Sequence, residues 1–190
     1  AAWKAMGTAN TVRVTTNTAD LPAPFGASPP PGMELSFTMT TVWQKPDKVW
    51  CDIGGEGLAR MFAMQMMQSG EQAWGYFPAK KVCFETDGSP IPSDPAEFVR
   101  QVMPGALADV EKMPWRKTGR KQVAGRDCHA LKTEERDAYT LAYVSRAGKP
   151  FMRFEYYSKP EGQLVGTCVI EVDPRVEAAV VIFAPPPDAE

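Results

Sequence analysis

The sequence lacks the signatures by which most enzymes and nucleic-acid-binding proteins are recognised. It contains one histidine, His129, and no G-x-S-x-G or similar nucleophile motif accompanies it, so no nucleophile–base pair can be named. Its 21 basic and 23 acidic residues give a net charge of −2, which creates no field to attract nucleic acid or an anionic membrane. No apolar run approaches the roughly 20 residues that a transmembrane helix needs. A hydrolase is therefore the weakest interpretation, and no cofactor is implied.

The four cysteines do not indicate a metal site, because no C-x-x-C or Cys/His spacing typical of zinc is present. An even number is compatible with two disulfides in an oxidising compartment. In a simple meander, however, no two of these cysteines fall on neighbouring strands. Strands lie about 4.8 Å apart, whereas a disulfide needs Cα atoms within roughly 7 Å. Buried free thiols are an equally good interpretation for Cys51, Cys83, Cys128 and Cys168.

The length of 190 residues fits a single domain over residues 1–190, and such a chain can bury a sizeable core or enclose a cavity. Residue 1 is not Met, and no basic-then-apolar segment follows it. We therefore expect a processed or trimmed start, from which an export signal has been removed.

Alternation of apolar and polar residues predicts a mainly β chain. Leu35, Phe37, Met39 and Trp43 fall on one face of an extended segment, which is the period-2 pattern of a sheet with one buried face. Turn residues separate this segment from others of similar pattern. We expect about eleven short antiparallel strands, at residues 11–18, 35–43, 49–53, 58–68, 72–77, 81–85, 115–123, 126–133, 138–145, 151–157 and 164–173.

Residues 58–68 are ambiguous. This segment is rich in methionine and lacks β-branched residues, so intrinsic propensity favours a helix. It is short, strand-like segments flank it on both sides, and its apolar groups lie on both faces. We therefore predict a strand, with a helix as the alternative.

A helical pair interrupts the strands at about residues 94–113. Asp94 can cap a helix, Pro95 suits its first position, and Glu97 completes a capping box. This first helix ends at Pro104, and a second short helix is expected over residues 106–112. One curled, unclosed sheet with a helical plug is the economical architecture.

Several motifs resemble the LolA/LolB-like superfamily of bacterial envelope lipoprotein carriers, which includes RseB-like and LppX/LprG-like relatives. VWQKPDKVW at residues 42–50 looks like the family's strand–(R/K)P-x-K–strand hairpin, and SGEQAWGYFPAKKV at residues 69–82 looks like its W-x-Y-x-P hairpin. VAGRDCHAL at residues 123–131 looks like the strand pair after the lid helices, and VVIFAPPP at residues 180–187 looks like the closing F-x-x-P segment. The resemblance implies an unclosed, curved antiparallel β-barrel with a short helical lid on its concave face.

The resemblance also implies an apolar cavity between the concave face and the lid. The methionines of residues 61–67 favour it, because methionine is flexible enough to line a site for acyl chains, although ordinary core filling is the alternative. Arg60 is the candidate for the arginine with which LolA-type carriers latch their lid. The residues expected to line the cavity are Phe37, Met39, Trp43, Arg60, Phe62, Met64, Met66, Trp74, Tyr76, Phe98, Val102, Met103, Leu107, Tyr143 and Phe154.

The basic residues between positions 116 and 121 and the single histidine each allow a functional interpretation and a simpler structural one. Arg116, Lys117, Arg120 and Lys121 form a basic run; a solvated strand face explains them, and a patch for lipid head groups or a partner protein is the alternative. His129 lies in a charged strand, where we expect a surface or hydrogen-bonded histidine rather than a catalytic one.

The leading hypothesis is a non-enzymatic binding protein of the bacterial cell envelope, periplasmic or exported, that shelters a lipid or lipoprotein acyl chain. A lipid anchor upstream of residue 1 is compatible with it. The alternative is a structural or regulatory module with a filled core on the same fold, which would contact an envelope partner protein. Interior volume separates the two, because an empty apolar cavity above about 300 Å³ favours lipid binding.

Overall fold

The computed structural model describes residues 3, 6–18, 36–104, 107 and 110–174. Within these residues the chain forms strands, one α-helix and one 3₁₀ helix, η1 (Gly57–Phe62). The helix is α2 (Pro95–Val102). The strands are β1 (Thr11–Thr18), β2 (Phe37–Gln44), β3 (Lys48–Gly55), β4 (Met64–Ser69), β5 (Gln72–Phe77), β6 (Val82–Asp87), β7 (Arg116–Val123), β8 (Arg126–Glu134), β9 (Ala138–Ser145), β10 (Phe151–Ser158) and β11 (Leu164–Val172).

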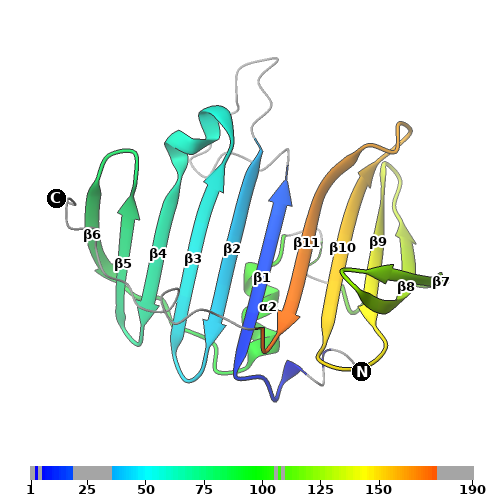
Figure 1. The fold of residues 1–190 in the computed structure, drawn as a ribbon, viewed down its shortest axis with the longest axis horizontal. Helices are drawn as coiled ribbons and strands as arrows, with labels where there is room; N and C mark the ends of the chain where they lie inside the picture. The colour runs from blue at the N-terminus through cyan, green and yellow to red at the C-terminus, as the bar shows by residue number, and fades with distance from the viewer. Residues whose placement is uncertain (1–2, 4–5, 19–35, 105–106, 108–109, 175–190) are drawn as a thin grey trace.

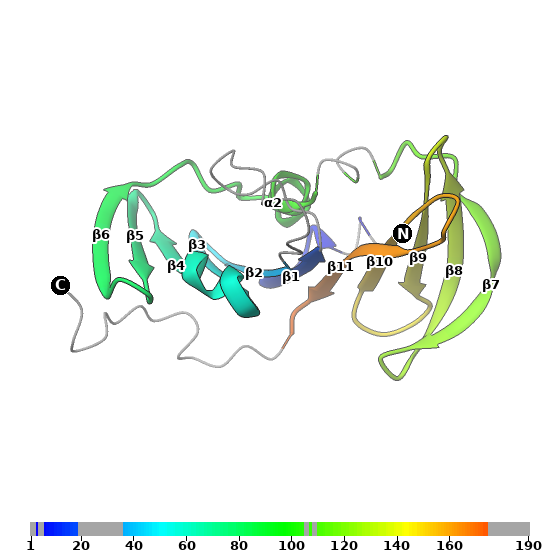
Figure 2. The same cartoon turned by 90° about the horizontal axis from the view of Figure 1, so that it is seen from above.

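All eleven strands belong to one antiparallel sheet with the order β6-β5-β4-β3-β2-β1-β11-β10-β9-β8-β7. Two meanders meet in its centre, because β1 pairs with both β2 and β11. The sheet is bent into a trough, with α2 inside the bend (Figures 1 and 2). Hydrogen bonds do not close it, since β6 and β7 remain at opposite edges. The predicted fold class, an open curved antiparallel sheet of about eleven strands, is confirmed.

The segment at residues 58–68 is only half strand. Its first part forms η1 (Gly57–Phe62) and its second part forms β4 (Met64–Ser69). Local propensity dominates where the chain turns between β3 and β4, whereas pairing with β3 and β5 holds the methionine-rich second half extended. The prediction of a continuous strand is therefore wrong for residues 58–62.

The predicted cap of the first lid helix is confirmed. The Asp94 carboxylate accepts a hydrogen bond from the Ala96 N–H at 2.9 Å, and Pro95 occupies the first turn. α2 packs on the concave side against β1 and β2, with Val99 fully buried. In the second expected helix, residues 110–112 form a turn, and residues 106, 108 and 109 lie outside the described part of the chain. The closing segment at residues 180–187 lies outside it as well.

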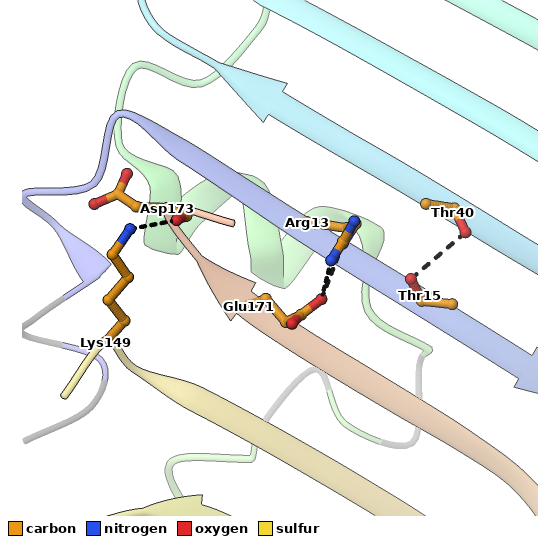
Figure 3. A network of polar contacts seen from close by, with 6 residues as sticks. All are labelled: Arg13, Thr15, Thr40, Lys149, Glu171 and Asp173. Carbon is orange, nitrogen blue, oxygen red and sulfur yellow. Dashed lines mark hydrogen bonds and ion pairs between the residues drawn. The ribbon is translucent and has the colours of Figure 1, made fainter. Parts of the chain in front are cut away.

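The two faces of the sheet differ in chemistry. On the concave face a continuous apolar core joins the central strands to α2. On the convex face of the central strands, polar side chains pair across the ladder, as Figure 3 shows with α2 behind the sheet. Arg13 of β1 donates to Glu171 of β11 at 2.5 Å, and the hydroxyls of Thr15 and Thr40 lie 3.5 Å apart. The convex centre therefore carries partly buried polar pairs, whereas the core that holds α2 lies on the concave side.

Candidate functional site

The strand register places the predicted cavity residues on two different faces. Residues directly opposite each other in an antiparallel ladder point to the same side. Met66 pairs with Gly75, and through β3 and β2 it shares the concave side with Trp43. Trp74 and Tyr76 of β5 alternate with Gly75 and therefore lie on the convex side. The prediction that these two rings form one wall with the methionines is wrong.

Tyr143 is a second such correction. It pairs with Arg153 on the convex side, where its hydroxyl donates to Glu155 at 3.2 Å. Burial raises the pKa of the Tyr143 phenol, and the neighbouring Glu155 carboxylate raises it further. Its neighbours Ala142 and Val144 face the concave side instead. Tyr139, Leu141 and Tyr143 alternate along β9, and the strand register places all three on the convex face.

The centre of the concave face is a packed core and not a cavity. Trp43 is fully buried, its ring centroid lies 6.4 Å from that of Phe98, and its Nε1–H donates to the Pro92 carbonyl at 3.0 Å. Met103 and Leu107 are buried beside them, and Val102 packs against the same cluster. The lid residues Phe98, Val102, Met103 and Leu107 therefore belong to the core that attaches the helical segment to the sheet.

The other predicted residues near the β2–β4 end of the sheet are not among the residues that line the cavity described below. Phe37 is buried and stacks edge-on with Phe62 at 6.4 Å, while Phe62 itself is 41% exposed. Arg60 is exposed on η1, so it does not point into the barrel as a latch would. Met39, Met64 and Met66 are half-buried on the concave side.

A cavity of about 520 Å³ lies at the opposite end of the trough, over strands β7 to β10. It is partly open to solvent, and most of its lining is apolar. Phe154 is the one member of the predicted set that borders it. The lining residues are Trp3, Val110, Glu111, Trp115, Lys117, His129, Leu131, Ala142, Val144, Met152 and Phe154.

The ladder explains how these residues come together. Leu131, Ala142 and Phe154 form one cross-strand row on β8, β9 and β10. His129, Val144 and Met152 form the next row. Strands β7 to β9 curl upward toward the side that carries α2 (Figure 2), so both rows face inward and build a curved apolar wall.

Two tryptophans that do not belong to strands, Trp3 and Trp115, also line the cavity. The Trp115 Nε1–H donates to the Val110 carbonyl at 2.7 Å, and its ring centroid lies 6.3 Å from that of Phe154. The Arg100 guanidinium lies over the Trp3 ring, with its Cζ atom 5.6 Å from the ring centroid. Arg100 also donates to Glu111 at 3.0 Å, so a contact with α2 positions both the ring and the carboxylate at the rim.

Strand β7 brings positive charge to the cavity. Lys117 borders the cavity, and Arg120 lies directly across from His129 in the β7–β8 ladder. The Nδ1 atom of His129 is shielded from water and has no hydrogen-bond partner in the described structure. Burial lowers the pKa of His129 below its ordinary value, and the positive charges of Lys117, Arg146 and Arg120 lower it further. A neutral imidazole therefore faces the mouth at neutral pH.

The sequence contained signals for this site that the interpretation did not use. Met152 and Phe154 are two residues apart in an extended segment, a spacing that puts both side chains on one face, and both border the cavity. Ala142 and Val144 were overlooked, because the aromatic side chains between them suggested the functional face. Trp115 follows a proline directly after the helical segment, and that position alone did not mark it as a wall residue.

All four cysteines are free, so of the two interpretations the free thiols hold and the two disulfides do not; Cys128 and Cys168 are buried, and Cys51 and Cys83 are half-buried. Cys168 lies in the central core, where burial raises the pKa of its thiol to about 11, so it is not an activated nucleophile. The described residues hold no group of three His, Cys, Asp or Glu side chains that could bind a metal ion. They also include no helix long and apolar enough to cross a bilayer.

No protein-family model matches the chain, and no curated protein is similar to it in sequence. Solved structures are similar in fold. An uncharacterised conserved protein of Thermus thermophilus matches 100% of the chain over 94% of its own, with a TM-score of 0.50 and 10% identity. The lipoprotein LppX of Mycobacterium tuberculosis (92% and 93% covered, TM-score 0.49, 8% identity) and LprF of Mycobacterium bovis (100% and 94% covered, TM-score 0.44, 13% identity) also match.

At such identities the likeness concerns the fold alone, and the match to the Thermus protein, with a TM-score of 0.50, supports it. It spans the whole chain, so the open curved sheet is not a local similarity. The chain therefore has the open, curved β-sheet fold that its motifs predicted from the LolA/LolB-like proteins.

Proposed function

We propose that the protein is a non-enzymatic carrier of the bacterial cell envelope that binds the acyl chain of a lipid or lipoprotein. The observation that carries this proposal is the apolar cavity of about 520 Å³ on the concave face. Small-molecule sites in proteins span roughly 300–1,000 Å³ and are lined mainly by apolar and aromatic side chains with a few polar groups. The walls formed by Leu131, Val144, Met152 and Phe154 fit that description.

The lining favours a flexible chain over a rigid ligand. The apolar part of the strand wall consists of Leu131, Ala142, Val144, Met152 and Phe154, whose side chains offer no directional hydrogen bonds. Binding would draw on apolar burial, which contributes about 0.8 kcal/mol for each CH₂ group removed from water. The resemblance of the sequence to envelope lipoprotein carriers supports the same ligand class and an exported location.

A chain-length series tests the proposal with uncharged ligands. Titration calorimetry of the purified protein with octanol, decanol and dodecanol should show the affinity rising by roughly fourfold per CH₂ group. The rise should stop once the chain outgrows the cavity. Native mass spectrometry of the protein as purified should also show bound lipid. No uptake of any alcohol, together with no co-purified lipid, would overturn the proposal.

A second candidate function is an interaction module whose interior serves only stability. The packed centre of the concave face, where Trp43 and Phe98 meet, favours it. This module would contact an envelope partner protein through its surface and would take up no alcohol. The same calorimetric series therefore separates the two functions.

A further inference from the structure

The cavity is apolar inside, but one rim concentrates cationic and imidazole side chains. Lys117 and His129 both border it, and Arg120 lies across from His129 in the ladder. Lys117 and Arg120 belong to β7, the edge strand of the sheet. Their side chains therefore meet no further strand on that side.

A β-bulge places both basic residues on the concave face. Regular alternation would send residues 117 and 120 to opposite faces. The register instead shifts between Lys117 and Gly119, so that Lys117 pairs with Leu131 and Arg120 pairs with His129. Leu131 and His129 both border the cavity. Bulges commonly re-aim a side chain next to a functional site, and here the extra residue brings a second cation to the rim.

These cations lack the partners that neighbouring charges have. In the described structure neither Lys117 nor Arg120 has an ion-pair partner, whereas Lys132 on the adjacent strand pairs with Glu134 at 2.7 Å. Glu111, the carboxylate that also lines the cavity, pairs with Arg100 instead. The rim on the β7 side therefore presents uncompensated positive charge to whatever emerges from the cavity.

We propose that the ligand is an amphiphile with an anionic head group, a carboxylate or a phosphate, which is bound at this rim by Lys117 and Arg120 while its chain fills the cavity. His129 donates a further hydrogen bond to the same head group. This inference rests on the proposed function and specifies its ligand class. Charge-assisted hydrogen bonds from Lys and Arg to an oxyanion are stronger than neutral ones, so they select the head group while the walls select the chain.

The electrostatics of His129 agree with this assignment. Burial lowers the pKa of its imidazole most, and the charges of Lys117, Arg146 and Arg120 lower it further. Asp127 alone raises it. An oxyanion bound at the rim would offset these charges. The pKa of His129 should therefore rise when an anionic ligand binds, and it should stay unchanged with an uncharged ligand of the same chain.

Three ligands with one alkyl chain test the proposal: dodecanol, dodecanoate and dodecyl phosphate. Calorimetry at low salt should show at least one of the anions binding more tightly than dodecanol. Lys117→Gln and Arg120→Gln should each lower the affinity for that anion by about threefold to tenfold and leave the affinity for dodecanol unchanged. Lys121→Gln is the matched control, because Lys121 lies on the same strand but on the convex side, 5.0 Å from the Tyr143 ring centroid. It should change neither affinity.

Because His129 is the single histidine, proton NMR reads its titration without assignment of the whole chain. A rise in its pKa with the anions, and none with dodecanol, would support the head-group site. The stronger of the two anions identifies the source as a carboxylate or a phosphate. If dodecanol binds as tightly as both anions, the head-group site is refuted and the carrier function stands. If no ligand binds, both are refuted.

Discussion

Val144→Phe is the sharpest test of whether the cavity is empty in the ligand-free protein. Val144 is half-buried in the wall, between His129 and Met152 of the neighbouring strands. The substitution adds four carbons, which at about 0.8 kcal/mol each could contribute at most about 3 kcal/mol. Because the cavity is partly open, part of the ring stays in water, and we expect a stabilisation of about 1 to 2 kcal/mol.

The same substitution in a filled part of the same face is the control. Val14 of β1 has no exposed surface, so Val14→Phe should overpack the core and cost about 1 to 3 kcal/mol. Urea unfolding with linear extrapolation measures both free energies, and unchanged m-values would show that the unfolded states are comparable. Val144→Phe should also lower the affinity of the protein for dodecanol at least tenfold. A loss of stability as large as that of Val14→Phe would show that no usable space exists beside Val144.

Three further substitutions or conditions test other parts of the structure. Gly75→Ala should cost about 1 kcal/mol or more in urea unfolding, because its Cβ would lie 2.0 Å from the Phe84 ring. Gly54→Ala, where a Cβ meets nothing within 4 Å, should be neutral or mildly stabilising, and equal effects at both would refute the packing described. Trp43→Phe leaves the Pro92 carbonyl without its hydrogen-bond donor and should lower the free energy of unfolding by about 1 to 3 kcal/mol. An unchanged free energy of unfolding would contradict that role. The lowered pKa of His129 means that the unfolded chain binds its proton more readily, so stability should fall as the pH drops below the ordinary histidine range. His129→Gln should remove that part of the pH profile, and an unaltered profile would assign it to other groups.

Local sequence was sufficient for the elements that depend on local chemistry. The helix that begins at Pro95 follows from its cap at Asp94. Period-2 alternation puts Met152 and Phe154 on one face of their strand, and both border the cavity. The segment at residues 58–68 shows the limit of this reasoning. Its intrinsic propensity favours a helix, which forms in the first half, whereas the neighbouring strands favour a strand, which forms in the second half.

The cavity over β7 to β10 lies in the other half of the trough from most of the residues that were predicted to line one. The methionine and aromatic content of β4 and β5 favoured a cavity there, but composition does not show how closely other elements pack over a strand face. In the centre α2 fills the concave side with Phe98 and Val99. Over β7 to β10 the described chain leaves space, and that space borders small or aliphatic side chains such as Ala142 and Val144.

The sequence by itself determined which residues share a face, where the turns fall and that the chain forms a mainly antiparallel sheet. These properties follow from alternation, capping and turn chemistry, all of which act over a few residues. The tertiary structure decided which of the two faces is concave, since the direction of bending depends on the whole sheet. It also decided that a bulge brings Lys117 and Arg120 to one rim, because register is set between strands and not within one.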